Sequence, residues 1–401
     1  MKPSGIEWIG DIPDDWEVRR GKYTLDLLMR PIRDNDEIIT CFRDGQVTRR
    51  SNRREDGFTF ADKEIGYQGI LKGDLVIHGM DGFAGAIGIS DSDGKGSPVL
   101  NVCRPKNGSD TRYINYYLRT LALQNVFIAL STGIRERSCD LRWKKIAELL
   151  FTIPPLKTQQ KIADYLDDKC GEIDATIAKQ KESIEKLKAY KQSLISEIVT
   201  KGLDKSVPLK PSGIKWLGEI PQNARIIRLR FLSSIQTGDK DTVNRVENGK
   251  YPFYVRSPIV ERIDTFSFDG EAILMAGDGV GAGKVFHYVN GKFDYHQRVY
   301  NIHNLKGVLG KFLYYYLREN FYKEIEQSNA KSTVDSIRLP MLLDFPIIVY
   351  PYDLQKEMVS FLDKKVAEID TIIIKKQNII QKLDAYKKSL IFECVTGKQI
   401  T

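Results

Sequence analysis

The chain repeats two segments of its own sequence, and this repeat constrains the fold more than any other feature. The segment Lys2–Pro13 returns as Lys210–Pro221 with nine of twelve positions identical. The segment Leu187–Thr200 returns as Leu383–Thr396 with ten of fourteen positions identical. A repeat of this length predicts two halves that are built on one plan.

The sequence between the repeated segments differs in the two halves. Residues 24–150 and 233–345 share little more than a pattern of apolar and polar positions. A repeated frame around two dissimilar inserts indicates one protein that holds two different binding modules. With 401 residues the chain has room for roughly two to four domains, each with its own core.

Composition narrows the class of protein. There are 61 lysines and arginines against 53 acidic residues, and this charge of +8 favours nucleic acid as a partner but also fits a merely basic surface. Five scattered cysteines and four unpaired histidines argue against a disulfide framework or a zinc site. Neither a signal peptide nor a run of ~18 apolar residues is found, so we expect a cytoplasmic protein.

Each half closes with a long helical pattern, which begins at Gln159 or Gln355 after a proline. The heptad core positions of the first pattern are Ile173, Ile177, Gln180, Ile184, Leu187, Lys191, Leu194 and Ile198. Those of the second are Ile369, Ile373, Lys376, Ile380, Leu383, Lys387, Leu390 and Cys394. Because the polar interruptions fall at matching places, we expect the two helices to pack on each other. The alternative is that each helix lies on its own domain.

An antiparallel pair of such helices predicts a rough two-fold relation between the halves. A helix from Glu172 to Thr200 spans roughly 43 Å at about 1.5 Å per residue. Dimeric readers of duplex DNA place their half-sites roughly 34–36 Å apart. The helices therefore have the length of a ruler between two reading modules, with one chain acting as its own dimer.

The variable inserts share a plan of strand, glycine-rich loop, strand and then an amphipathic helix, predicted over Tyr113–Thr132 and Leu309–Gln327. The loop Gly277–Lys284 is not a phosphate-binding loop, because Asp278 and Val285 stand where the motif needs glycine and a hydroxyl residue. The chain also lacks an Asn-Pro-Pro-Tyr motif, a dinucleotide fingerprint, a metal-ligand cluster and a nucleophile–base pair. We therefore do not expect catalysis by this chain.

A basic segment in the first insert is the strongest candidate for DNA contact. Five arginines lie within the twelve residues from Arg43 to Arg54. Arginine presents two parallel donors that match guanine O6 and N7, and it also binds phosphate. The alternative is a solvated basic loop, since acidic residues dilute the charge. The second half has Tyr254–Ser257 at the comparable place, and this different chemistry predicts a different half-site.

A third candidate surface precedes each closing segment. It comprises Thr132–Ser138 in the first half and Gln327–Thr333 in the second. Small, polar and basic side chains on a loop suit contacts in a DNA groove, and they equally suit an ordinary exposed turn.

Together these residues resemble the DNA-specificity subunits of type I restriction-modification systems, over essentially the whole chain. The resemblance rests on the Pro-Ser-Gly-Ile-x-Trp-x-Gly-x-Ile-Pro arms, the strand and loop Gly73–Asp81, Ile153-Pro-Pro-Leu with Gln159-Gln-Lys-Ile, and both Leu-x-Ala-Tyr-Lys-x-Ser-Leu-Ile helices. One departure is the second closing segment, Tyr350–Glu357, which lacks the Pro-Pro-Leu-x-x-Gln pattern. This helix start is therefore expected to dock its partner less typically.

The resemblance implies an α+β fold with a pseudo-two-fold internal repeat. Two target-recognition domains, each a mixed β-sheet with flanking helices, are expected at residues 1–157 and 209–352. The spacer helices are expected at residues 158–208 and 353–401, forming an antiparallel coiled coil. The DNA-binding residues carried over are Arg43, Arg49, Arg50, Arg53, Arg54, His78, Asp81, Arg135, Arg137, Tyr254, Arg256, Ser257, Asp278, Ser328 and Lys331.

The resemblance also implies partners. Each domain reads one half of an asymmetric, interrupted duplex site, and the subunit recruits two modification (methyltransferase) subunits and two ATP-dependent restriction subunits. S-adenosylmethionine, ATP and Mg²⁺ belong to those partners, and this chain binds no cofactor. Two other classes of function stay open from the sequence: an adaptor that joins two protein subunits without reading DNA, and an enzyme with its own recognition domains.

Overall fold

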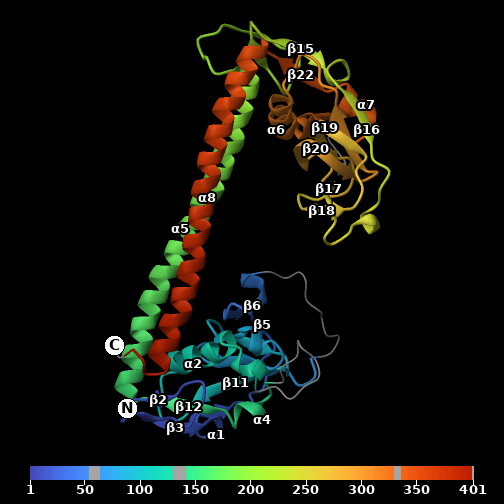
Figure 1. The fold of residues 1–401 in the computed structure, drawn as a ribbon. Helices are drawn as coiled ribbons and strands as arrows, with labels where there is room; N and C mark the ends of the chain where they lie inside the picture. The colour runs from blue at the N-terminus through green and yellow to red at the C-terminus, as the bar shows by residue number, and fades with distance from the viewer. Residues whose placement is uncertain (54–63, 130–140, 329–335, 400–401) are drawn as a thin grey trace. The chain divides into compact units, whose positions relative to one another are not determined.

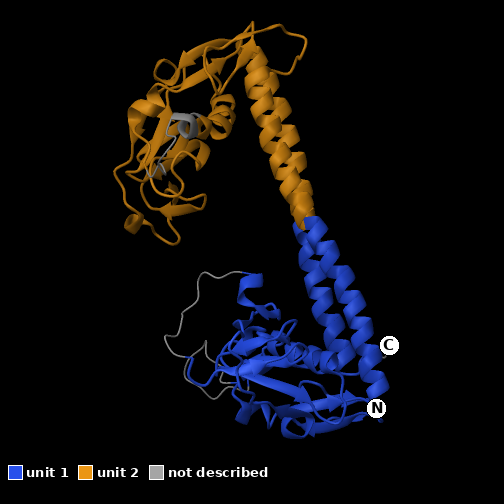
Figure 2. Cartoon of the chain, turned by 180° about the vertical axis from the view of Figure 1, so that it is seen from behind, with its two compact units in different colours: residues 1–180, 377–401 blue, residues 181–376 orange. Residues whose placement is uncertain are grey.

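The computed structural model describes residues 1–53, 64–129, 141–328 and 336–399. The chain divides into two compact units, residues 1–180 with 377–401 and residues 181–376. Figure 2 shows that each unit contains one variable insert and a stretch of both long helices. Within the part of the chain that the structure describes, no helix combines the length and apolarity that crossing a membrane requires.

The first unit contains short strands and short helices (Figure 1). Its strands are β1 (Lys2–Pro3), β2 (Asp11–Ile12), β3 (Glu17–Arg20), β4 (Leu25–Leu27), β5 (Ile39–Cys41), β6 (Val47–Arg49), β7 (Gln68–Ile70), β8 (Leu75–His78), β9 (Ile87–Ile89), β10 (Gly94–Gly96), β11 (Leu100–Pro105) and β12 (Leu150–Ile153). Its helices are α1 (Gly21–Thr24), α2 (Thr111–Leu123), α3 (Val126–Ala129) and α4 (Trp143–Ile146), with 3₁₀ turns η1 (Arg50–Asn52) and η2 (Gly82–Ala84).

The second unit follows a similar plan with fewer short elements and longer central strands. Its strands are β13 (Leu209–Pro211), β14 (Glu219–Pro221), β15 (Arg225–Arg228), β16 (Ser234–Thr237), β17 (Tyr251–Tyr254), β18 (Val260–Ile263), β19 (Phe268–Ala276), β20 (Phe286–Tyr295), β21 (Val299–His303) and β22 (Pro346–Val349). Its helices are α6 (Gly310–Ser328) and α7 (Leu339–Leu343), with 3₁₀ turns η3 (Leu229–Phe231) and η4 (Thr242–Asn244). The long helices α5 (Leu156–Lys201) and α8 (Tyr352–Val395) contribute to both units.

The central sheets of the two units share one strand order. In the first unit the order is β4-β11-β8-β9, and in the second it is β16-β21-β19-β20, extended by β17-β18. The shared strands are antiparallel, and the extension is joined by a parallel pairing of β17 with β20. The sheet is therefore mixed in the second unit. The α+β class and the internal repeat are confirmed.

The repeated N-terminal arms pack onto their own units. In the first unit the Trp8 ring lies 6.2 Å from Tyr117 and 6.4 Å from Phe392, measured between centroids. In the second unit Trp216 stacks on Phe345 at 5.8 Å. Packing of an aromatic ring contributes a large apolar area, so each half-buried tryptophan anchors its arm to its own unit.

Helix α2 is shorter than the predicted Tyr113–Thr132. Its N-terminus is capped by Asp110, whose carboxylate accepts from the backbone N–H groups of Arg112 and Tyr113. It ends at Leu123, because Asn125 adopts a left-handed conformation with φ +57° and interrupts the helical path. Helix α6 agrees with the prediction to within one residue at each end.

The long helices begin three residues earlier than predicted, at Leu156 and Tyr352. The predicted heptad positions form their buried face. Fully or nearly buried members are Ile173, Ile177, Ile184, Ile198, Ile369, Ile373, Leu390 and Cys394. In the first unit the N-terminal part of α5 packs on the C-terminal part of α8, and in the second unit the reverse holds. The two helices thus pair antiparallel, as predicted.

Two ion pairs fix the register of this pairing. In the first unit Lys387 Nζ lies 2.6 Å from an Asp174 oxygen, and in the second Lys191 Nζ lies 2.5 Å from Asp370. The step from Asp174 to Lys191 along α5 equals the step from Lys387 back to Asp370 along α8, so both units obey one register. Each repeat contributes one lysine and one aspartate at equivalent positions. The polar heptad positions 191 and 387 are therefore paired rather than left unsatisfied.

A buried glutamine ties the start of each long helix to the loop before α2 or α6. Gln159 Oε1 accepts from the Asp110 N–H at 2.9 Å, and its amide donates to the Pro154 carbonyl at 2.8 Å. Gln355 makes the same contacts with the Leu309 N–H and the Tyr350 carbonyl, each at 2.8 Å. The unusual segment Tyr350–Glu357 therefore keeps the same helix start despite its different sequence.

We expect Gln159→Ala to lower the free energy of unfolding by roughly 1–3 kcal/mol, because it strands a buried N–H and a buried carbonyl. Gln160→Ala is the matched control, since Gln160 is exposed one position further along the same helix. Chemical denaturation of both variants measures the difference. Equal midpoints for the two variants would contradict the anchoring role of Gln159.

Candidate nucleic-acid interface

In the first unit, two loops that are distant in sequence meet at one cavity. The turn of the β5–β6 hairpin meets the loop that follows β8, and the cavity between them has a volume of about 550 Å³. Among its lining residues are five that the sequence predicted as DNA contacts: Arg43, Arg50, Arg53, His78 and Asp81. The tertiary structure thus gathers the basic segment and the loop after the central strand into one site.

Arg43 and Asp81 form an ion pair across this cavity. Nη2 of Arg43 donates to Asp81 Oδ1 at 2.8 Å, and the arginine side chain remains 67% exposed. The backbone beneath the pair is tightly packed, because a Cβ at Gly85 would lie 2.6 Å from the Arg43 carbonyl oxygen. Gly85 also has φ +94°, so a residue with a side chain is strained there.

A half-buried arginine supports this loop from behind. Nη1 of Arg119, in α2, donates to the carbonyl oxygens of Gly85 and Ile87, each at 3.1 Å. Helix α2 therefore holds the loop after β8 in place; its segment Tyr116–Arg119 has the same sequence as Tyr315–Arg318 in α6. In the second unit the corresponding Arg318 contacts Tyr314 and Glu319 instead.

His78 orients the same loop through its ring. Nδ1 accepts from the Asp81 N–H at 2.9 Å, so in this neutral ring Nε2 carries the proton. Burial lowers the pKa of His78 below its ordinary value of 6.5, although the charge of Asp81 opposes the shift. His78 is therefore neutral at pH 7 and holds Asp81 toward Arg43.

The other arginines of the basic segment are partly held by the protein itself. Arg53 lies over the Phe42 ring at 4.1 Å and pairs with Asp44 at 2.8 Å. Arg50 donates to Thr40 Oγ1 at 3.4 Å. These contacts place both guanidinium groups along the cavity wall.

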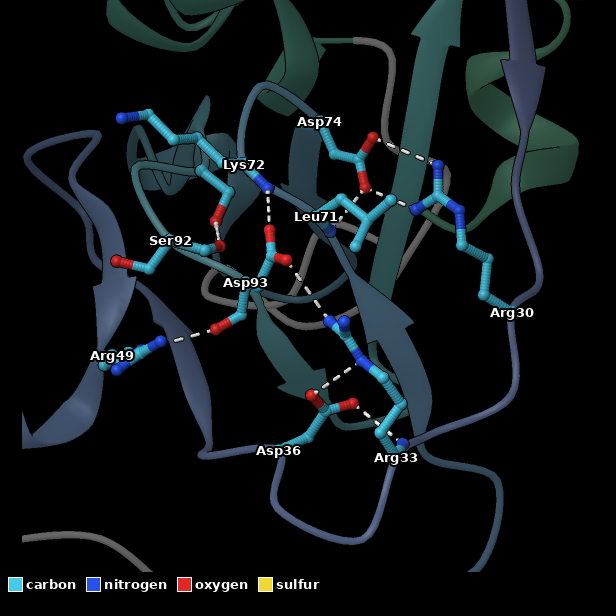
Figure 3. Close-up of polar contacts among 10 residues, drawn as sticks. Arg30, Arg33, Asp36, Arg49, Leu71, Lys72, Asp74, Ser92 and Asp93 are labelled. Atoms are coloured by element: carbon cyan, nitrogen blue, oxygen red, sulfur yellow. Dashed lines mark hydrogen bonds and ion pairs between the residues drawn. The ribbon is translucent and has the colours of Figure 1, made fainter.

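Arg49 lies apart from this cavity. Figure 3 shows its guanidinium beside the Asp93 carbonyl oxygen, to which Nε donates at 3.3 Å. It also donates to Glu37 at 3.1 Å. The Asp93 carboxylate accepts from the Lys72 N–H at 2.8 Å and pairs with Arg33 at 3.3 Å. Arg49 thus belongs to a network that braces the strand β6 rather than to the wall of the cavity.

A second structural network surrounds Asp74, which sequence reasoning did not single out. Its carboxylate is fully buried and pairs with Arg30 (Figure 3). It also pairs with Arg104 at 2.9 Å. It also accepts from the Leu71 N–H at 2.8 Å. A buried carboxylate needs such partners. Asp74 therefore ties the start of β8 to β11 and to the segment that follows β4.

Four predicted contact residues, Arg54, Arg135, Arg137 and Lys331, lie outside the described residues. Ser328 is the last residue of α6, and its side chain is not among those described.

The second unit has a site at the equivalent place. Asp278 follows β19, and its carboxylate accepts from Arg256 Nη1 at 3.2 Å. A second guanidinium, that of Arg298, lies 3.7 Å from the same carboxylate. Arg298 was missed by sequence reasoning, because a lone arginine in a turn between two strands carries no pattern.

Tyr254 and Ser257, two further predicted residues of the second site, both contact His287. The Tyr254 ring lies 5.0 Å from the His287 ring, and the Ser257 carbonyl faces His287 Nε2 at 3.3 Å. Ser257 Oγ donates to the Ile259 carbonyl at 3.1 Å. Burial lowers the pKa of His287, so this ring is neutral at pH 7.

The two sites are built by the same backbone contacts. The Gly79 N–H donates to Val99 and the Gly277 N–H to Arg298, both at 2.8 Å. Their carbonyls in turn accept from Leu141 and Ile337 at 2.8 and 2.7 Å. The loops therefore occupy one frame, while the side chains around them differ. Within the described residues no group of three His, Cys, Asp or Glu side chains is placed to hold a metal ion.

Comparison with known proteins identifies the family. The Type I restriction modification DNA specificity domain matches residues 51–188 and 226–384, one match in each half. Together the two matches cover well over half of the chain. The chain therefore belongs to the family of type I restriction-modification DNA specificity proteins.

Individual relatives carry names of the same kind. The chain is 27% identical over 181 residues to the type I restriction enzyme EcoDI specificity subunit of Escherichia coli, covering 45% of this chain and 40% of that protein. It is also 27% identical over 280 residues to the type I restriction enzyme MjaVIII specificity subunit of Methanocaldococcus jannaschii, covering 64% and 63%. These matches thus span less than two thirds of either relative.

Solved structures share the fold. A chain from a study of complex assembly and conformational transition of a type I R-M system superposes with a TM-score of 0.75 at 14% identity, covering 97% of this chain and all of that one. The HsdS subunit from Thermoanaerobacter tengcongensis superposes with a TM-score of 0.53 at 14% identity, covering 97% and 98%. At this identity the likeness establishes the fold alone.

The His78 ring predicts a dependence of stability on pH. Because its pKa is lowered on folding, the unfolded chain binds a proton more readily, and the free energy of unfolding falls as the pH drops below 6.5. His78→Asn keeps an acceptor for the Asp81 N–H but does not titrate in this range. We expect the variant to lose less stability than the wild type between about pH 7.5 and about pH 5.5 in thermal unfolding. Identical losses would contradict the role of the neutral ring.

Proposed function

We propose that this chain selects the duplex sequence on which a type I restriction-modification complex acts. Each recognition domain reads one half of an asymmetric, interrupted site. The observation that carries this proposal is the pair of sites built in one backbone frame with different side chains. Such an arrangement suits two readers of different sequences that must be presented in the same way.

The chemistry of both sites supports contact with DNA. Arg43 and Arg256 are exposed in the turns that follow β5 and β17. The chain carries an excess of eight positive charges, which favours association with a polyanion. We assign recognition to residues 1–157 and 209–352, and the spacing between half-sites to residues 158–208 and 353–401.

The division of labour within the complex is part of the proposal. We assign methyl transfer and ATP-dependent restriction to two modification and two restriction subunits, with S-adenosylmethionine, ATP and Mg²⁺ bound by those partners. The chain itself is a non-catalytic cytoplasmic subunit in this scheme. An assay of the isolated chain with Mg²⁺ and with S-adenosylmethionine tests it, and either cleavage or methylation would overturn the assignment.

An adaptor that joins protein subunits without reading DNA is the alternative from another class. A pure adaptor has no need for different side chains, such as His78 and Arg298, around otherwise equivalent loops. The repeated arms and helices serve both schemes, since identical surfaces suit two copies of one partner.

Selection of bound sequences from a pool of random duplexes separates these schemes. With the modification subunits present, we expect a bipartite motif with two different halves and an unspecified spacer. The affinity should also fall with salt by about 0.9 log unit per tenfold salt for each phosphate neutralised. Recovery of no bipartite motif, or a flat salt profile, would contradict sequence reading.

The spacing role of the helices predicts the outcome of an insertion. Seven residues are added after Glu182 in α5 and after Asn378 in α8, so that the antiparallel register set by the Lys–Asp pairs is kept. We expect the preferred spacer to lengthen while both half-sites stay unchanged. The control is the same insertion in α5 alone, which shifts the register and should lower stability. An altered half-site in the double insertion would contradict the ruler.

A further inference from the structure

The two dissimilar inserts retain one common device, an arginine paired with an aspartate at the rim of each site. Arg43 follows the first strand of its hairpin and pairs with Asp81 in the loop after β8. Arg256 follows β17 and pairs with Asp278 in the loop after β19. The four residues thus occupy equivalent positions in the two units.

The backbone beneath the device is also the same in both units. A Cβ at Gly85 would lie 2.6 Å from the Arg43 carbonyl oxygen, and a Cβ at Gly281 would lie 2.6 Å from the Arg256 carbonyl oxygen. In each unit a glycine of the second loop therefore lets the chain that carries the arginine approach closely. This contact sets the position of the arginine backbone relative to its aspartate.

The pair contributes little to stability, which points to another role. Both arginines are well exposed, at 67% and 46% of their side-chain surface. An exposed ion pair contributes only about 0–1 kcal/mol to folding. Its effect is instead to restrict the rotamers of the guanidinium group, so that less conformational entropy is lost when a ligand binds.

Each guanidinium keeps donors for a ligand. Asp81 accepts from Nη2 of Arg43, and Asp278 accepts from Nη1 of Arg256. In both cases one terminal nitrogen is engaged by the carboxylate. The guanidinium group has five N–H donors. It can therefore still bind a planar ligand edge that carries two acceptors.

The carboxylate also distinguishes between the possible ligands. A phosphate would be attracted by the arginine but repelled by the aspartate beside it, because each Arg–Asp pair by itself has no net charge. In the second unit Arg298 adds one positive charge 3.7 Å from Asp278. The major-groove edge of a G·C base pair matches the donors and acceptors of the arginine and aspartate. Guanine O6 and N7 accept from arginine, while cytosine N4 donates to a carboxylate. The paired charges therefore favour a base edge over the backbone.

We infer that the Arg43–Asp81 and Arg256–Asp278 pairs each read one G·C base pair in the major groove, one in each half-site. This inference rests on the proposed function and names the base pair that the two sites have in common. The surrounding side chains, His78 in the first unit and Arg298 in the second, set the bases on which the half-sites differ.

The experiment is a selection from random duplexes by the complex with its modification subunits, in which base preference is measured at every position. We expect Arg43→Gln to reduce the preference for guanine at one position of one half-site by roughly tenfold to a hundredfold, the contribution of one bidentate contact. Arg256→Gln should do the same in the other half-site only. The matched controls are Arg20→Gln and Arg228→Gln, which remove exposed, ion-paired arginines at equivalent positions of β3 and β15. The controls should change neither half-site.

A second variant separates base reading from phosphate contact. Asp81→Asn removes the negative charge beside Arg43, so a phosphate contact predicts tighter binding to all sequences. Base reading predicts weaker discrimination at the same base pair that Arg43→Gln affects. Uniform tightening, or an unchanged motif with Arg43→Gln, would overturn the inference while leaving a bipartite motif intact. Absence of a bipartite motif with the wild-type chain would instead overturn the proposed function.

Discussion

The antiparallel seam between α5 and α8 is the constraint on which the rest of the structure depends. Its apolar heptad positions give affinity between the helices but tolerate several registers. The lysines at core positions 191 and 387 remove this freedom, because each has an aspartate opposite it in only one register. A lysine with 15% of its side chain exposed, such as Lys191, would be strongly destabilising without its partner. Since each repeat provides one lysine and one aspartate, the duplicated sequence suffices to define both pairs.

The variable insert of each unit is fastened to this seam by contacts that the repeat supplies twice. Gln159 and Gln355, both buried, join the start of each long helix to the loop before α2 or α6. In the first unit the Tyr113 and Thr152 hydroxyls also donate to the Val395 carbonyl at the end of α8. A helix end would otherwise leave such carbonyls without partners. The same hydrogen bonds therefore complete the long helices and fix the segments before α2 and α6 against them.

Much of the fold could be predicted from the sequence, and the failures have local causes. The heptads, the glycine-rich loop between β19 and β20 and the arms are confirmed, because each follows from a periodic or repeated pattern. The predicted end of α2 was wrong. The left-handed backbone conformation of Asn125 ends the helix, although the amphipathic sequence pattern continues beyond it. The helix starts differ by three residues, as expected where proline permits a first turn.

The sequence by itself determined the internal repeat, the antiparallel helices and the two different inserts, since these depend on short-range periodicity and on identity between segments. The tertiary structure alone decided which of the basic residues form a site. Arg43 and Asp81 are distant in sequence and meet only because β8 pairs centrally in the sheet, while Arg49 in the same basic segment turns away toward Asp93. Neighbouring side chains on a strand point to opposite faces, so proximity in sequence does not predict a shared surface. In the second unit Arg298 lies near Asp278 because β19, which precedes Asp278, pairs with β21, which follows Arg298.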